Sequence, residues 1–240
     1  MIDVHCHILP DADDGPESWE EAAAMGRMAA ADGITHVVAT PHANFEYAYD
    51  RRRHAGAVRQ LQERLGGAPE IRLGCDMHFS AENFQAALND PSAFAIAGTH
   101  YQLVELSDFS IPSTLLQNFR ALMDAGLRLV LTHPERNPLL LRHPDQVLEW
   151  VREGLIVQVT ANALTGYWGR TAQLAARWLL DHQAVHVVAS DAHDTRHRPP
   201  LLSEARRVLR RWRNEDVARA LVEDNPAAIL RDEELPYRPE

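Results

Sequence analysis

Short apolar runs alternate along this chain with longer segments in which apolar residues recur every three or four positions. The short runs are typical of buried strands, and the periodic segments are typical of amphipathic helices. The runs that predict strands are residues 2–5, 34–40, 70–75, 102–106, 128–132, 155–160 and 185–190. The segments that predict helices are residues 17–32, 50–65, 81–88, 113–125, 144–153, 170–181, 202–213, 215–223 and 226–230.

The order of these elements predicts the fold class. Strands that alternate with helices indicate an α/β protein with parallel strands. Seven such strands predict a distorted (β/α)7 barrel of the TIM-like kind, with an open doubly wound sheet as the alternative. No Gly-x-Gly-x-x-Gly turn follows the first strand, which weighs against the open sheet. No linker, repeat or low-complexity tract interrupts the pattern, so we expect a single domain over residues 1–240.

Composition narrows the function classes. The formal net charge of -10 disfavours a nucleic-acid binder, and no apolar run is long enough to predict membrane insertion. The N-terminus lacks the apolar core of a signal peptide. Two cysteines, Cys6 and Cys75, give no disulfide framework, which is consistent with a reducing compartment. We therefore expect a cytoplasmic location.

Histidines and acids follow almost every predicted strand. Barrel enzymes carry their chemistry at the carboxyl ends of the strands. His5 and His7 are two residues apart, so they share one face of the first strand. The full set at these strand ends is His5, His7, Asp13, Asp14, His42, Asp76, His78, Glu105, His133, Asp191 and His193. Such a set predicts a polynuclear metal site, to which only the sixth strand contributes no evident ligand.

The residue types restrict the metal chemistry. Mixed histidine and carboxylate ligands suit manganese, iron or zinc and disfavour calcium alone. Many binuclear barrel hydrolases bridge their metals with a carboxylated lysine, but all 24 basic residues here are arginine. A bridge must then be a carboxylate, and Asp76 is the best candidate. A cysteine-dependent phosphatase is excluded, because no arginine stands six residues after either cysteine.

Several longer motifs accompany these residues. They are His5-Cys6-His7-Ile8-Leu9-Pro10, Asp13-Asp14-Gly15-Pro16, Ala39-Thr40-Pro41-His42, Leu103-Val104-Glu105, His133-Pro134-Glu135-Arg136, Ser190-Asp191-Ala192-His193 and Arg198-Pro199-Pro200. Together they resemble the metal-dependent tyrosine phosphatases of bacterial capsule and exopolysaccharide operons (the CpsB/CapC-like group). These belong to the polymerase and histidinol phosphatase (PHP) superfamily. The resemblance extends from residue 1 to about residue 231 and leaves residues 232–240 as a C-terminal tail.

The resemblance implies a distorted PHP-type barrel with three divalent metal ions, manganese first, with iron or zinc also accepted. His5, His7 and Asp191 would hold the first metal, and Asp76 would bridge it to a second held by Glu105 and His133. The ligands of the third metal would be Asp14, His42 and His193. Arg136 and Arg198 would bind the substrate phosphate. The family usually has glutamate at the position of Asp76, and this departure leaves full occupancy of the three sites open.

The implied reaction is hydrolysis of a phosphomonoester by a hydroxide that two metals share. The expected substrate is the phosphotyrosine-bearing tail of a bacterial tyrosine kinase. A small-molecule phosphatase, acting on histidinol phosphate or a nucleotide, is the alternative on the same scaffold. A DNA-processing or non-catalytic PHP module is the third reading, and the acidic charge weighs against it.

Three groups of residues near the predicted site could have either a structural or a functional role. Asp13 suits a turn or helix cap. Phe45, Tyr47 and Tyr49 follow His42, and Tyr167-Trp168 follow the sixth strand. Both aromatic groups could line a site for an aromatic phosphoester or simply pack their own loops.

Overall fold

Parallel strands form the centre of the structure, a computed structural model that describes residues 1–239. One sheet has the order β1-β2-β4, and the other has the order β3-β5-β6-β7-β8-β9. The strands are β1 (Ile2–Cys6), β2 (His36–Ala39), β3 (His42–Ala43), β4 (Glu70–Leu73), β5 (Asp76–His78), β6 (Tyr101–Glu105), β7 (Arg128–Thr132), β8 (Ile156–Thr160) and β9 (Val187–Ala189). All the paired strands within these sheets are parallel, which confirms the α/β class with parallel strands.

A second short strand follows the second predicted strand, and another follows the third. Thr40-Pro41 separates β2 from β3, and Gly74-Cys75 separates β4 from β5. Proline lacks a backbone N–H, and a side chain at Gly74 would come within 2.9 Å of Val38. The runs 34–40 and 70–75 therefore predicted β2 and β4 correctly, but β3 and β5 were not predicted, and the strands within residues 1–239 number nine.

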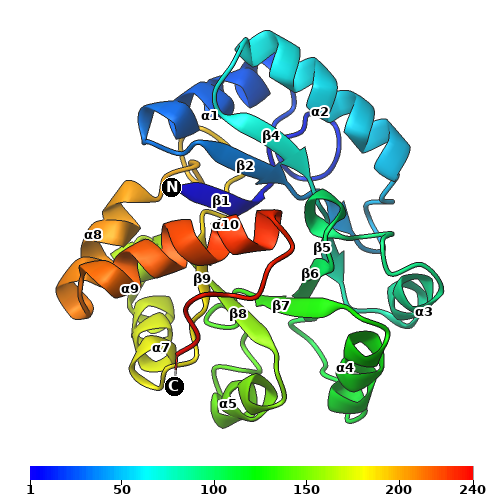
Figure 1. The fold of residues 1–240 in the computed structure, drawn as a ribbon, viewed down its shortest axis with the longest axis vertical. Helices are drawn as coiled ribbons and strands as arrows, with labels where there is room; N and C mark the ends of the chain where they lie inside the picture. The colour runs from blue at the N-terminus through cyan, green and yellow to red at the C-terminus, as the bar shows by residue number, and fades with distance from the viewer. Residues whose placement is uncertain (240) are drawn as a thin grey trace.

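Helices surround the strands on their outer side (Figure 1). They are α1 (Trp19–Ala31), α2 (Arg51–Leu65), α3 (Ala81–Asn89), α4 (Leu115–Asp124), α5 (Asp145–Arg152), α6 (Ala161–Thr165), α7 (Arg170–Asp181), α8 (Ser203–Trp212), α9 (Glu215–Arg219) and α10 (Asn225–Leu230). The sequence did not predict α6, which is too short to show a helical period. Thr160 caps its first turn, and Gly166 ends it with a left-handed backbone (φ 85°).

The interior of the strand assembly is apolar at the end opposite the predicted site. Val4, Leu103 and Val187 pack there with residues from α10, among them Ala228 and Ile229. Figure 1 shows α10 lying across the strands. This helix covers the amino ends of the strands, so their carboxyl ends are left for chemistry.

A buried carboxylate joins the first strand to the last. Both the backbone N–H and the hydroxyl of Ser190 donate to Asp3, the former over 3.0 Å. Complete burial of Asp3 raises its pKa to about 6, although the bonds from Ser190 oppose that rise. An isolated parallel bridge between Cys6 and Ala192 continues the contact. The two edges of the sheets thus meet beside the predicted ligands.

Two further findings concern the cysteines and the presence of membrane-spanning helices. Cys6 and Cys75 are both buried and free. Within residues 1–239, no helix has the length and the apolar character needed to cross a membrane.

His186, which lies just before β9, should make folding stability depend on pH. Burial lowers its pKa to about 4, and its Nδ1 accepts a hydrogen bond from the Val157 N–H over 3.1 Å. The unfolded chain therefore binds a proton more readily between pH 6.5 and pH 4. We expect the contribution of neutral His186 to be complete above pH 6.5 and to be lost as pH falls toward 4, by up to about 3 kcal/mol.

Denaturant unfolding of the metal-free protein at pH 7 and pH 4 measures this contribution. The His186→Gln variant should lose less stability than the wild type over that interval. His197→Gln is the matched control, because the His197 side chain is 82% exposed. Equal losses in the wild type and His186→Gln would contradict the expectation.

Candidate metal centre

All nine predicted metal ligands lie together in the structure. Four overlapping groups of side chains have their ligand atoms within 4.8 Å of one another. The groups are His7/Asp14/His42/His193, His5/His7/Asp76, His5/His133/Asp191 and His42/Asp76/Glu105. Five histidines and four carboxylates, contributed by β1, β3, β5, β6 and the segments after β1, β7 and β9, thus form one cluster.

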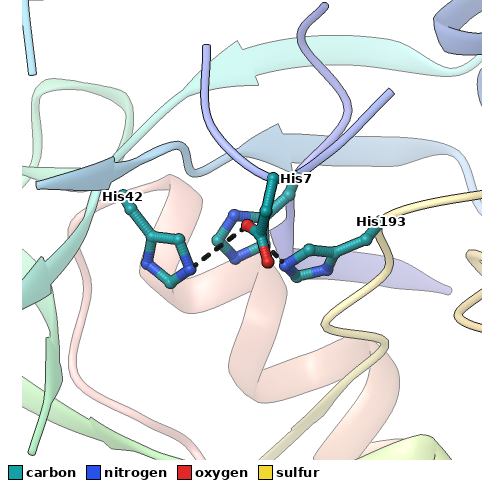
Figure 2. A group of neighbouring side chains, drawn as sticks. His7, His42 and His193 are labelled. Atoms are coloured by element: carbon teal, nitrogen blue, oxygen red, sulfur yellow. Dashed lines mark ion pairs between the residues drawn. The ribbon is translucent and has the colours of Figure 1, made fainter. Parts of the chain in front are cut away.

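The first group surrounds the carboxylate of Asp14. The Asp14 Oδ1 atom lies 3.2 Å from His193 Nε2 and 3.5 Å from His42 Nε2. Figure 2 shows the rings of His7, His42 and His193 converging on one point. The third predicted ligand set is therefore assembled in space, with His7 beside it.

Asp76 occupies the middle of the cluster. Its Oδ2 atom lies 3.5 Å from His5 Nε2 and 3.4 Å from His42 Nδ1. Glu105 continues the chain of contacts, 3.6 Å from both His42 Nδ1 and His133 Nε2. A carboxylate between two groups of ligands is the position that a bridging residue requires.

Several of these atoms lack hydrogen-bond partners although they are buried. Among the described residues, both Asp76 oxygens, His42 Nδ1 and His193 Nε2 have none. Burying such atoms unpaired is costly, and each is a good ligand for a divalent cation. The donor set therefore fits a metal centre with several ions.

The electrostatics of the protein without metal agree with this reading. Burial disfavours the charge on Asp191, but His5 and Arg198 outweigh burial and hold the pKa of Asp191 well below its ordinary value. His5 and His42 have the same effect on the buried Asp76. Burial and the neighbouring histidines lower the pKa of His7 well below its usual range. Asp191 and Asp76 thus stay anionic and His7 stays neutral, as metal ligands must. Asp76 outweighs burial and raises the pKa of His5 to about 9 and that of His42 to about 10, so these two histidines must lose a proton when metal binds.

Two residues orient His5 and His7. The Nδ1 atom of His5 lies 2.9 Å from Gln158 Oε1, and that of His7 lies 2.6 Å from Asp13 Oδ2. These contacts direct each Nε2 into the cluster, where the two Nε2 atoms are 3.1 Å apart. The sequence did not predict either role. Asp13 also makes the expected turn, because the Gly15 N–H donates to it over 3.0 Å.

The backbone at two predicted ligands is in the left-handed region. His133 has φ 32° and Asp191 has φ 53°, and neither is a glycine. His133 directly follows β7, and Asp191 follows β9 after one residue. Such strain is typical of functional sites, and here it occurs where the chain turns from a strand into the cluster.

Arg136 and Arg198 lie at one side of the cluster and are half-buried. Both guanidiniums donate to Asp191 Oδ2, with Arg198 Nη2 at 2.8 Å. Trp168 packs against them, with its ring centroid 3.8 Å from the Arg136 Cζ atom and 5.4 Å from that of Arg198. The two predicted phosphate-binding arginines are therefore next to the predicted metal ligands.

The aromatic residues of the loop after β3 lie in two different environments. The Tyr47 ring lies nearly parallel to the His42 ring with centroids 6.3 Å apart, and Phe45 is 93% exposed. Tyr49 packs inward against His54 and Phe94. Tyr47 thus lies beside the predicted metal ligands, whereas Tyr49 packs against the apolar core.

Parallel strands that carry a buried cluster of histidines and carboxylates at their carboxyl ends define a metal-dependent class of α/β enzyme. The sequence model of the capsular polysaccharide synthesis family CpsB/CapC matches residues 1–231. The chain belongs to this family, which confirms the resemblance seen in the motifs.

Individual relatives agree with the family assignment. The chain is 30% identical over 243 residues to the tyrosine-protein phosphatase YwqE of Bacillus subtilis, covering 100% of this chain and 95% of YwqE. It is 29% identical over 213 residues to the putative tyrosine-protein phosphatase CapC of Staphylococcus aureus, covering 85% and 81%. A crystal structure from work on YwqE and Streptococcus pneumoniae CpsB, described as unique metal-dependent tyrosine phosphatases, matches with a TM-score of 0.92. That match has 29% identity and covers 100% of this chain and 99% of the other.

Proposed function

We propose that this protein is a metal-dependent protein-tyrosine phosphatase that hydrolyses phosphotyrosine on a capsule- or exopolysaccharide-regulating tyrosine kinase. The observation that carries the proposal is the cluster of nine ligands beside two arginines. The names of the relatives and the match to a metal-dependent tyrosine phosphatase structure support it.

The nine ligands suit three divalent cations, with manganese as the first choice and iron or zinc as alternatives. His5, His7 and Asp191 would hold one, Glu105 and His133 a second, and Asp76 would bridge these two. Asp14, His42 and His193 would hold the third. Bound cations of this kind supply positive charge and activated water at neutral pH.

The arginines would act on the phosphate itself. A guanidinium pairs with phosphate oxygens through two parallel N–H groups and stays charged at any physiological pH. Arg136 and Arg198 would bind the oxygens on which negative charge develops as the phosphoryl group is transferred. A phenolate is a fairly good leaving group, so phosphotyrosine makes only modest demands on a general acid.

We also propose a closed barrel architecture and a cytoplasmic location for this protein. A closed seven-stranded barrel, counting β2 with β3 and β4 with β5, would form one phosphatase domain over residues 1–240. The bridge between Cys6 and Ala192 and the bond from His7 N–H to the Ala192 carbonyl (2.8 Å) support closure. Free, buried cysteines support a cytoplasmic location.

The deciding experiment compares kcat/KM for a phosphotyrosine peptide with the values for histidinol phosphate and a nucleoside monophosphate, with manganese supplied. We expect the peptide to be preferred by about tenfold or more, which corresponds to about 1.4 kcal/mol of transition-state binding. A preference for either small substrate would overturn the tyrosine-phosphatase assignment and retain the metal site. Absence of turnover with all three would contradict phosphatase function.

A further inference from the structure

Trp168 contacts both of the arginines that we assign to phosphate binding. Its ring centroid lies 3.8 Å from Arg136 Cζ and 5.4 Å from Arg198 Cζ. Arg136 follows β7 and Arg198 follows β9, so residues from two different strand ends meet on one indole. Both distances are within the range of cation–π attraction, which is strongest for tryptophan.

The two guanidiniums need such a partner because their charges repel each other. On one side both donate to the same oxygen of Asp191. Asp191 is also close to His5 and His7, at 3.5 and 3.6 Å, and is a proposed metal ligand. Its single negative charge is therefore shared by the two guanidiniums and His5, and would be shared with a metal as well. The indole gives the arginines a second attractive surface that does not compete for metal.

The surrounding chain holds Trp168 in place. Its backbone N–H donates to the Asn162 carbonyl over 3.3 Å, and its side chain packs against the main apolar core. Two glycines with left-handed backbone, Gly166 (φ 85°) and Gly169 (φ 87°), bracket the turn. Within residues 1–239, the Trp168 Nε1 atom is buried without a hydrogen-bond partner. Packing and the guanidiniums, rather than a side-chain hydrogen bond, therefore fix the ring.

We propose that Trp168 is a positioning residue whose indole is a shared cation–π platform that holds Arg136 and Arg198 side by side to receive one phosphoryl group. This inference rests on the proposed function, because it assumes that the two arginines bind the substrate phosphate. Trp168 acts through the arginines and contributes nothing to metal binding. An aromatic ring is needed at this position, but the indole N–H is not.

The test uses the manganese-loaded full chain and two substitutions, Trp168→Leu and Trp168→Phe. The first removes the aromatic face, and the second keeps it. The readouts are KM and kcat for a phosphotyrosine peptide and the Kd for inorganic phosphate by calorimetry. Loss of the aromatic face should raise KM and the phosphate Kd by about tenfold or more, whereas Trp168→Phe should stay within about threefold of the wild type.

Controls separate positioning from folding. Trp212 is a suitable match, because its ring lies under another arginine, Arg177, at 5.0 Å. Trp212→Leu should leave KM and the phosphate Kd unchanged. Metal content and thermal unfolding of each variant show that the centre is loaded and the chain is folded. If Trp168→Leu does not fold, Trp168→Phe against Trp168→Tyr and Trp168→Met provides the same aromatic comparison.

The experiment separates failure of the Trp168 proposal from failure of the proposed phosphatase function. An active wild type whose KM and phosphate Kd do not change in a folded Trp168→Leu variant would overturn the platform alone. Equal damage in Trp168→Phe and Trp168→Leu would also overturn it, because the aromatic face would not be what matters. If the wild type hydrolyses no phosphotyrosine but its phosphate Kd rises in Trp168→Leu, the phosphatase assignment is wrong. The role of Trp168 in positioning the two arginines is then supported.

Discussion

The Asp191→Asn variant is expected to lose phosphatase activity by about a thousandfold or more in kcat/KM. Asp191 Oδ1 lies 3.5 Å from His5 Nε2, and Oδ2 accepts from both Arg136 and Arg198. The carboxylate is 2% exposed, so water cannot replace its charge. An amide would leave buried cations unpaired and would weaken metal binding at the same time.

Steady-state kinetics with a phosphotyrosine peptide, together with metal analysis of the purified variant, checks this result. Asp124→Asn is the matched control, because Asp124 is an exposed residue at the end of α4. It should behave as the wild type. Near-normal activity of Asp191→Asn would mean that Asp191 neither holds metal nor orients the two arginines.

Removal of metal by a chelator should abolish activity and lower thermal stability together. The nine clustered ligands leave several buried polar atoms unpaired in the absence of metal, including both oxygens of Asp76. Each ion at a thousandfold excess over its Kd would stabilise the folded state by about 4 kcal/mol. For a chain of this size we expect the melting temperature to fall by about 10 °C or more.

Calorimetry or fluorescence melting before and after chelation measures the shift, and an activity assay follows the same samples. Adding manganese back should restore both properties. A chelator already saturated with manganese is the control and should have no effect. Full activity after complete metal removal, as shown by elemental analysis, would exclude the proposed mechanism.

The sequence could locate many of the proposed ligands because they stand at the end of an apolar run or directly after one. His133 follows the apolar run 128–132, and Asp191 follows the run 185–190, so the strand pattern alone locates them. The strands β3 and β5 were harder to foresee. Both lie just beyond the apolar runs 34–40 and 70–75, and with two and three residues they are too short to show a strand pattern.

The residues that orient the site were not predictable for a different reason. Gln158 belongs to an otherwise apolar strand, and its partner His5 is 153 positions away in the sequence. Local pattern carries no information on a contact of that kind. Asp13 has an adequate local explanation as a turn residue, which conceals its contact with His7. For Trp168, aromatic packing in a loop is the ordinary reading until both arginines are seen against its ring.

The contact between Asp3 and Ser190 has a consequence for biosynthesis. The two residues are 187 positions apart, and the proposed ligands His5 and Asp191 lie close to them in the chain. Domains form as the chain is made from its N-terminus, and contacts between distant residues form slowly. His5 and His7 are made first, whereas the last proposed ligands, Asp191 and His193, are made near residue 190. If these residues hold metal, cations captured earlier would meet an incomplete coordination shell, and loading would be complete only after residue 193 has been translated.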